Sequence, residues 1–350
     1  MDDTINIPGY GDTTILNDYI DSVKASTGVM ICTSDTKPSE VMNHLRQDLF
    51  VILIGDYQCS SYIMNYVHHY ENELSDRRDI ETRRTRKSRL CFIARENCLV
   101  DVSGLPSDID FVQWLDDDLR SNLYLLPLRR LERILTDIRR AEEGISYDFL
   151  DSKIYIKPFV YVPSDESVPL MYMKYIDMFR DKSVIDMGTG TGILALLAAQ
   201  SGATRVVGVD INPLAVACAE NNVAKTGFSD FVTMIESNLF DNIDGQFDVI
   251  IFNAPWVQGK IVNVYEQAIY DSEFSVLKQF IATAGMHLTP DGIILLQFSD
   301  ISQQTDGSMD ILYEQLELHG FSITDSTSIK RRNRLFGRIE RVYLFEIHQK

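Results

Sequence analysis

Short apolar runs alternate with longer helical patterns through the C-terminal half of the chain. Four of these runs are rich in β-branched or aromatic residues and predict buried strands of a parallel sheet. Helices are predicted after the first two, over 194–199 and from Pro213 onward, with Asn212 as the N-cap of the second. Strands alternating with helices predict an α/β fold. The predicted strands are 184–186, 205–210, 231–235 and 247–252.

A similar alternation runs from Val29 to about Gly144. It predicts a smaller α/β domain, preceded by a polar, acidic lead over residues 1–28 with helical pieces. A single glycine at Gly55 leaves any nucleotide fingerprint incomplete, so we interpret the domain as partner-binding, dimerising or substrate-shaping, with nucleotide binding as an alternative. Its predicted strands are 29–32, 49–55 and 90–94, and its predicted helices begin at Pro38 and span 60–73 and about 127–143.

The segment between the two patterns predicts a junction. Residues 155–162 could form a hairpin strand, and residues 168–179 predict a helix leading into the first strand of the C-terminal core. The expected organisation is an N-terminal α/β domain at 1–145, a linker hairpin and helix over the active site at 146–182, and a C-terminal domain at 183–350.

Composition agrees with a globular protein of two domains. The 350 residues are 45% hydrophobic, enough to fill two cores. No apolar run reaches transmembrane length, and the first residues lack the charge pattern of a signal peptide. The five cysteines are odd in number and show no paired CxxC spacing, which favours reduced thiols. We expect a cytoplasmic protein with no membrane association and no bound metal.

Charge is distributed unevenly along the chain. The formal net charge is −18, and residues 151–329 carry 9 basic and 23 acidic side chains. Such a field repels a polyanion and admits a neutral or cationic ligand, which argues against a nucleic-acid partner. Two basic clusters, at 77–89 and 330–334, could reverse the field locally. The alternative is a solvated loop or helix face for the first and a hairpin turn for the second.

A glycine-rich turn follows the first C-terminal strand. The strand reaches Asp186, and Gly188, Gly190 and Gly192 precede a helix. Glycines allow a tight turn and close backbone approach, and the helix N-terminus can lie against a cofactor. The second strand ends in Asp210, whose carboxylate can accept hydrogen bonds from both ribose hydroxyls. These features predict a nucleoside-containing cofactor, which could be a dinucleotide, ATP or another.

Further motifs in the same order carry a family resemblance. The third strand leads to Glu236-Ser237-Asn238-Leu239-Phe240, the fourth ends in Asn253-Ala254-Pro255-Trp256, and Val162-Pro163-Ser164-Asp165-Glu166-Ser167 precedes the core. Over about residues 155–300 the chain resembles the class I S-adenosylmethionine-dependent methyltransferases. Within them it is most similar to the release-factor glutamine methyltransferases and related amino-methylating enzymes, which carry an Asn-Pro-Pro-Tyr-type tetrapeptide and an Ile-Pro-Arg-Pro-Glu-Thr segment.

The resemblance implies a Rossmann-like class I methyltransferase core with a seven-stranded, mostly parallel sheet. It also implies S-adenosyl-L-methionine as the cofactor. Asn238 stands where the family usually has aspartate, and an asparagine can both donate to and accept from adenine. The residues expected to bind the cofactor are Asp186, Gly188, Thr189, Gly190, Gly192, Ile193, Asp210, Ile211, Asn238, Leu239 and Asn253.

The tetrapeptide Asn253, Ala254, Pro255 and Trp256 is the catalytic segment that the resemblance implies. Planar amide, guanidine and exocyclic base nitrogens are poor nucleophiles. The Asn253 side-chain oxygen and the Ala254 carbonyl would hold two N–H groups, and Trp256 would stack on the planar group. Ala254 replaces a proline and Trp256 a tyrosine. The alternative is Asn253 as a turn residue and Trp256 as part of the core.

Substrate contacts are expected from Trp256 and Glu166. Glu166 matches the family's acidic position, although it could equally be a carboxylate that stabilises a helix N-terminus. Ser164 and Asp165 replace the family's arginine and proline. Residues 259–272 are a candidate lid. The acidic residues that could bind a cation are Glu166, Glu266, Asp271 and Glu273.

These observations favour an N-methyltransferase acting on a planar nitrogen, guanidine or amide, of an amino acid or small metabolite. A protein glutamine or arginine side chain is the first alternative. A nucleic-acid base nitrogen is the second, and a non-catalytic binding module of methyltransferase fold is the third. The N-terminal domain could support a homodimer.

Overall fold

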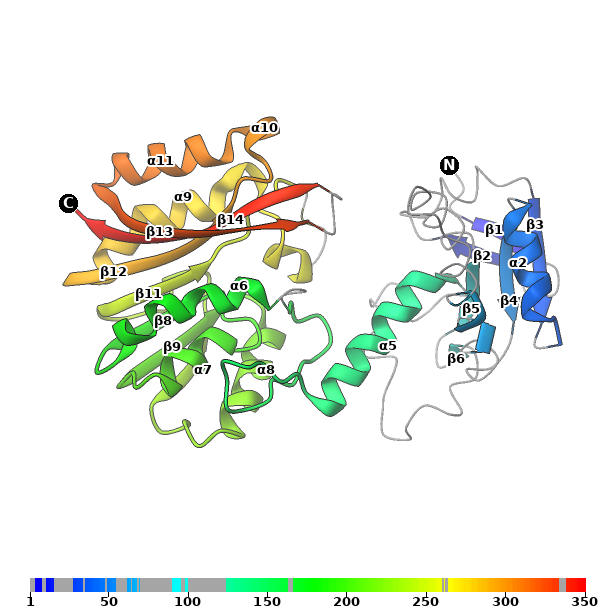
Figure 1. Ribbon diagram of the computed structural model, residues 1–350, viewed down its shortest axis with the longest axis horizontal. Helices are drawn as coiled ribbons and strands as arrows, with labels where there is room; N and C mark the ends of the chain where they lie inside the picture. The colour runs from blue at the N-terminus through cyan, green and yellow to red at the C-terminus, as the bar shows by residue number, and fades with distance from the viewer. Residues whose placement is uncertain are drawn as a thin grey trace. The chain divides into compact units, whose positions relative to one another are not determined.

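The chain divides into two compact units, Met1–Arg139 and Arg140–Lys350. Within them the computed structural model describes residues 4–7, 11–15, 28–33, 35–47, 49–54, 62–63, 65–67, 69, 90–95, 98–99, 124–162, 166–259, 261, 264–333 and 338–350. Figure 1 colours the chain from its N-terminus to its C-terminus.

The first unit contains a seven-stranded mixed sheet with the order β1-β2-β7-β5-β4-β3, and β6 pairs with β5. Strands β3, β4 and β5, with β3 at the edge, are parallel, and β7 is antiparallel to β5. The elements are β1 (Thr4–Ile7), β2 (Gly11–Ile15), β3 (Gly28–Thr33), α2 (Pro38–Arg46), β4 (Leu49–Ile54), β5 (Leu90–Arg95), β6 (Cys98–Leu99), β7 (Tyr124–Pro127) and α5 (Leu128–Glu143), the last of which contains the boundary between the units.

The pattern predicted β3, α2, β4, β5 and α5. The described parts of the predicted helix at 60–73, residues 62–63, 65–67 and 69, are helical. The helical pieces expected at the start of the chain are wrong where the structure describes that segment, because β1 and β2 form an antiparallel pair there. Three residues in each of these strands are threonine or isoleucine, and β-branched side chains fit a pleated strand.

The second unit contains a seven-stranded sheet with the order β10-β9-β8-β11-β12-β14-β13. The first five strands in this order, from β10 to β12, are parallel. β14 is antiparallel to both of its neighbours, β12 and β13. This confirms the expected mostly parallel sheet. The strands are β8 (Ser183–Met187), β9 (Arg205–Asp210), β10 (Val232–Glu236), β11 (Phe247–Asn253), β12 (Leu288–Ser299), β13 (Phe321–Arg332) and β14 (Ile339–Gln349).

Helices cover both faces of this sheet, as expected for a parallel sheet buried on both sides. Figure 1 shows α6, α7 and α8 on one side and α9 and α11 on the other. The helices are α6 (Ser167–Leu170), α7 (Ile193–Gln200), α8 (Pro213–Ala224), α9 (Ser275–Ala284), α10 (Gln303–Asp306) and α11 (Ser308–Leu318), with short 3₁₀ segments η4 (Met171–Phe179), η5 (Val264–Ala268), η6 (Ser272–Phe274) and η7 (Gly285–His287).

The junction differs from its prediction in two ways. Residues 155–162 form no strand. The residue just before them, Ile154, makes an isolated antiparallel β-bridge with Ile145. The helix expected over 168–179 is one α-turn, α6, followed by the 3₁₀ segment η4. No helix in the described part of the chain is long and apolar enough to cross a membrane.

Candidate active site

The carboxyl ends of the parallel strands meet at one edge of the second unit's sheet. The strand register aligns Glu236 with Asp210, Val209 with Met187, and Met187 with Phe252. The loops that follow β8, β9, β10 and β11 therefore all leave the sheet on the same edge, which is where open parallel sheets bind ligands. These loops contain the residues that the sequence singled out.

The glycine turn after β8 requires its glycines. Gly188, Gly190 and Gly192 have φ values of 67°, 56° and 82°, in the left-handed region that favours glycine. A Cβ on Gly190 would lie 3.5 Å from the carbonyl oxygen of Tyr161, and one on Gly192 would lie 3.1 Å from the Cβ of Ala219. The turn therefore exposes backbone where a side chain would otherwise stand.

Asp186 holds this turn from inside the protein. Its side chain is 1% exposed, and its Oδ2 accepts hydrogen bonds from the Thr189 hydroxyl at 2.7 Å and from the backbone N–H of Ala195 in α7 at 3.1 Å. Burial raises the pKa of Asp186 to about 7, against the lowering effect of these two donors. The geometry makes Asp186 a support of the loop and of the α7 N-terminus.

Asp210 faces the same turn from the end of β9. Its Oδ2 accepts from the backbone N–H of Gly190 at 2.9 Å, and its Oδ1 accepts from that of Asn212 at 2.9 Å. Each carboxylate oxygen has a second lone pair, so the group can still accept the two hydroxyls of a ribose. The neighbouring Ile211 is 44% exposed and offers an apolar surface beside it.

The junction segment is fastened to the glycine turn by Asn222 of α8. This fully buried side chain donates to the carbonyls of Tyr155 and Thr191 at 2.8 Å each and accepts from the Tyr155 N–H at 2.9 Å. Asn212, the predicted N-cap of α8, accepts from Leu214 N and donates to the Phe159 carbonyl. The sequence did not single out Asn222, because its partners lie far away in the chain.

The loop after β10 places Asn238 and Leu239 at the same edge. Asn238 is exposed and donates to Asp241 Oδ2 at 3.3 Å, while Leu239 is 7% exposed with a φ of 47°. A left-handed leucine is strained, and such strain is found where a loop must follow one particular path.

The tetrapeptide continues β11 past the sheet. Asn253 is half-buried and in register with Gln297 of β12, whereas Ala254 and Pro255 are buried. Trp256 is only 9% exposed, and the guanidinium carbon of Arg331 lies 5.9 Å from the centroid of its indole. One face of Trp256 therefore already stacks on a protein cation, a contact that the sequence did not predict.

Gln297 ties the helix after the junction to this strand end. Its Nε2 donates to the Val168 carbonyl of α6 at 2.9 Å, and its buried Oε1 has no hydrogen-bond partner among the described residues. Parallel neighbours in register point to the same face of a sheet, so Asn253 faces the side that carries α6. Glu166 lies exposed just before α6 and makes no side-chain cap bond there.

The two described ends of the candidate lid contact each other. Val257 and Tyr270 form a bridge, and a Cβ on Gly259 would lie 2.3 Å from the Tyr270 ring. Asp271 is fully buried, and its carboxylate accepts from Val276 N and Leu277 N at the start of α9. Asp271 is therefore a helix-capping group, and its carboxylate is not available to bind a cation.

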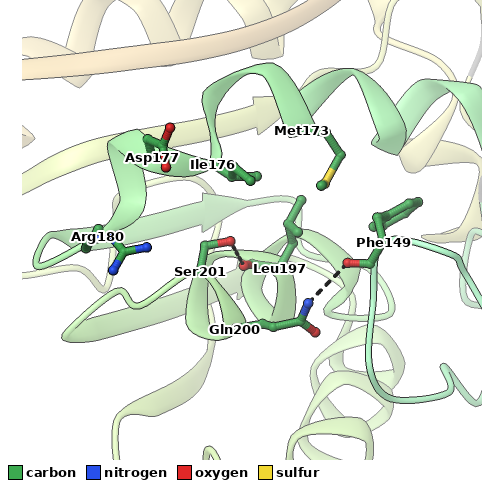
Figure 2. Close-up of a pocket in the computed structure, with 8 residues that line it drawn as sticks. All are labelled: Phe149, Met173, Ile176, Asp177, Arg180, Leu197, Gln200 and Ser201. Atoms are coloured by element: carbon green, nitrogen blue, oxygen red, sulfur yellow. Dashed lines mark hydrogen bonds between the residues drawn. The ribbon is translucent and has the colours of Figure 1, made fainter.

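A shallow hollow of about 250 Å³ opens elsewhere in the second unit, between η4 and the C-terminal end of α7. Figure 2 shows Gln200 bonded to the Phe149 carbonyl and Ser201 bonded to the Leu197 carbonyl within it. None of the residues expected to bind cofactor or substrate lines it. The α7 N-terminus, beside the glycine turn, is the end of that helix that faces the candidate site.

The second unit is similar to known methyltransferases. Residues 165–318 match the methyltransferase small domain. A Methanocaldococcus jannaschii protein, described as a candidate protein N5-glutamine methyltransferase, is 29% identical over 184 residues, which are 51% of this chain and 89% of that protein. A ribosomal protein L11 methyltransferase of Thermosipho africanus is 30% identical over 157 residues, 43% of this chain, and the chain spans 57% of that relative's length.

Two solved structures are also similar to this chain. A ribosomal protein L11 methylase of Lactobacillus delbrueckii subsp. bulgaricus is 22% identical and has a TM-score of 0.41, covering 56% of this chain and 85% of that one. A methyltransferase of Thiobacillus denitrificans in complex with S-adenosyl-L-homocysteine is 13% identical with a TM-score of 0.39, covering 52% of this chain and 92% of that one.

The residues present suit the expected cofactor. Three left-handed glycines expose backbone at the end of β8, the Asp210 carboxylate keeps lone pairs for hydroxyls, and Ile211 offers an apolar surface beside it. With the sequence matches, this arrangement shows that residues 165–318 form a methyltransferase small domain, a domain of S-adenosylmethionine-dependent enzymes.

Proposed function

We propose that the enzyme methylates the side-chain amide nitrogen of a glutamine in a protein. The observation that carries this proposal is Asn253, a half-buried amide at the end of β11, at the edge where the glycine turn and Asp210 meet. The M. jannaschii relative described as a candidate protein N5-glutamine methyltransferase supports the choice of acceptor.

In this proposal the cofactor lies along the edge formed by the ends of β8, β9 and β10. Gly188, Gly190 and Gly192 would approach its methionine part with backbone, and Asp210 would accept the ribose hydroxyls. The adenine would lie near Asn238 and Leu239, with Ile211 beside the ribose, while Thr189 and Ile193 belong to the turn against the methionine part. When bound, S-adenosylmethionine supplies the sulfonium methyl group.

The protein's own task is to align an amide nitrogen and to stabilise the positive charge that develops on it. The Asn253 side-chain oxygen and the Ala254 carbonyl are acceptors for the two amide N–H groups. Trp256 and buried Pro255 would exclude water from this position, and Gln297 would keep α6 and Glu166 beside it. We assign partner binding or substrate shaping to the unit Met1–Arg139, which has its own sheet.

A small guanidine- or amide-bearing amino acid is the second candidate acceptor. Glu166 is exposed next to the site and could bind the cationic end of such a molecule. The two candidate acceptors differ in size. A free amino acid needs room only at the carboxyl edge of the sheet, whereas a glutamine in a protein also needs an accessible surface around that edge for the rest of the protein.

Mass spectrometry of reactions with S-adenosylmethionine tests this proposal. Glutamine-containing peptides, free amino acids and RNA are offered separately, and we expect methyl groups on the peptides. Asn253→Ala should lower kcat by about 10²–10³-fold, as the loss of one preorganised polar group does in other enzymes. Asn221→Ala, a half-buried asparagine in α8, is the matched control and should keep its activity. Methylation of RNA alone, or full activity of Asn253→Ala, would contradict the proposal.

A further inference from the structure

The β13–β14 hairpin extends beyond the edge that carries the candidate active site. The last ladder pair between β12 and β14 joins Ser299 to Val342. The hairpin continues past it with three more pairs, Lys330 with Arg341, Arg331 with Glu340, and Arg332 with Ile339. At about 3.4 Å per residue, the described overhang is about 10 Å long.

This overhang has the opposite charge to the rest of its unit. Residues 330–341 contain six basic side chains and one acidic, whereas residues 151–329 contain 9 basic and 23 acidic. Lys330, Arg332 and Arg338 are exposed, and Ile339 beside them is 76% exposed. A positive, partly apolar surface therefore stands at the edge of a strongly negative unit.

A buried carboxylate anchors the base of the overhang. Glu340 is 1% exposed, and it accepts from Arg331 Nε at 2.8 Å, Asn333 Nδ2 at 3.1 Å and Ser299 Oγ at 2.7 Å. The guanidinium of Arg331, held in this way, lies over the Trp256 indole, with its Cζ 5.9 Å from the ring centroid. The base of the hairpin therefore contacts the tetrapeptide through Arg331. Successive side chains of a strand point to opposite faces, so Lys330 and Arg332, the neighbours of Arg331 in β13, lie on the outer face of the hairpin.

We propose that this overhang, defined by Lys330, Arg332, Arg338 and Ile339, is a docking surface for an acidic polypeptide segment next to the methylated side chain. The inference rests on the proposed function, since it names the surroundings of the acceptor glutamine. Opposite charges across such a contact bring the partner to the site and set its orientation.

A short acidic segment fits this surface better than a nucleic acid does. A nucleic-acid strand carries a phosphate on every nucleotide, so it would continue from the overhang onto the negative remainder of the unit. A polypeptide segment with a few acidic residues can bind to the overhang alone, and Ile339 offers an apolar contact to the other side chains of that segment.

Binding of three defined probes to the full chain tests the proposal. The probes are a peptide with one glutamine flanked by glutamates and aspartates, the same peptide with serines in place of the acids, and a short polyuridylate. Fluorescence anisotropy measures each at low and at physiological ionic strength. Lys330→Glu combined with Arg338→Glu reverses two exposed cations of the overhang. Lys182→Glu combined with Lys350→Glu makes the same charge change at the opposite edge of the sheet.

The acidic peptide should bind about tenfold more tightly than the serine peptide at low salt, and the overhang variant should lose that difference. The matched control should retain it. The inference would be overturned if the acidic peptide bound the overhang variant as tightly as it binds the natural chain. It would also be overturned if the variant lost binding of polyuridylate but not of the acidic peptide. Binding without methylation contradicts only the proposed acceptor. If the overhang variant methylates both peptides as fast as the natural chain does, only the docking surface is contradicted.

Discussion

The backbone N–H of Gly190 donates to Oδ2 of Asp210 at 2.9 Å, joining the turn after β8 to the end of β9. The hydrogen bond orients the carboxylate toward the turn, while its second oxygen is held by Asn212 N at 2.9 Å. Two motifs 20 residues apart in the chain thereby become one binding surface.

Asp210→Asn should weaken S-adenosylmethionine binding. The amide keeps one acceptor oxygen but loses the charge that strengthens hydrogen bonds to the ribose, a loss of about 1.5–3 kcal/mol. Isothermal titration calorimetry should show a Kd raised by roughly 10–100-fold. Asp230→Asn, an exposed aspartate before β10, should leave the Kd unchanged. Equal affinities of the natural chain and Asp210→Asn would rule out the ribose role.

Gly192→Ala should destabilise the protein more than Gly227→Ala. Both glycines have nearly the same φ, 82° and 81°, so both substitutions cost about 1–2 kcal/mol of left-handed strain. The new Cβ at Gly192 would also lie 3.1 Å from Ala219 Cβ, whereas at Gly227 it meets nothing within 4 Å. Urea unfolding followed by circular dichroism measures the difference, and equal midpoints would show that the turn can shift away from α8.

Asp186→Asn should change how stability depends on pH. Burial raises the pKa of Asp186 to about 7 from an ordinary value of 3.8, so the folded state binds this proton more tightly than the unfolded state does. The stabilisation is present below about pH 4 and is lost as the pH rises to about 7. The free energy of unfolding of the natural chain should therefore fall more steeply from pH 5 to pH 8 than that of Asp186→Asn. Parallel curves would show that the carboxyl is ionised throughout.

Glu340→Gln should loosen the end of the β13–β14 hairpin. It removes the charge opposite Arg331, whose side chain is only 15% exposed, and leaving a buried charge unpaired costs about 3 kcal/mol. Hydrogen exchange over 328–333 and 338–342 should accelerate. In Glu346→Gln, the control, the partner is His348 at 2.8 Å and the change should be small. Unchanged exchange in Glu340→Gln would show that Ser299 and Asn333 hold the hairpin without the ion pair.

Local patterns were sufficient to predict four strands of the second unit's sheet and the loops that follow them. The runs that became β8, β9, β10 and β11 are apolar and β-branched, and a buried parallel strand needs little else. The glycine turn was equally readable, because the positive φ values of Gly188, Gly190 and Gly192 demand that residue type. The helical reading of residues 1–28 failed at β1 and β2, where the strands pair with each other over a short connection.

The sequence by itself therefore determined the order of the motifs and the class of cofactor, since each motif is a local solution to backbone geometry. The tertiary structure decided which residues support them. Gln297 bonds to Val168 129 positions away, Asn222 to Tyr155 67 positions away, and Glu340 to Ser299 41 positions away. Such partners meet only when the sheet is assembled, and a buried polar side chain must find them or pay the cost of desolvation. The spacing of residues along the chain therefore does not predict which distant residues will form these hydrogen bonds.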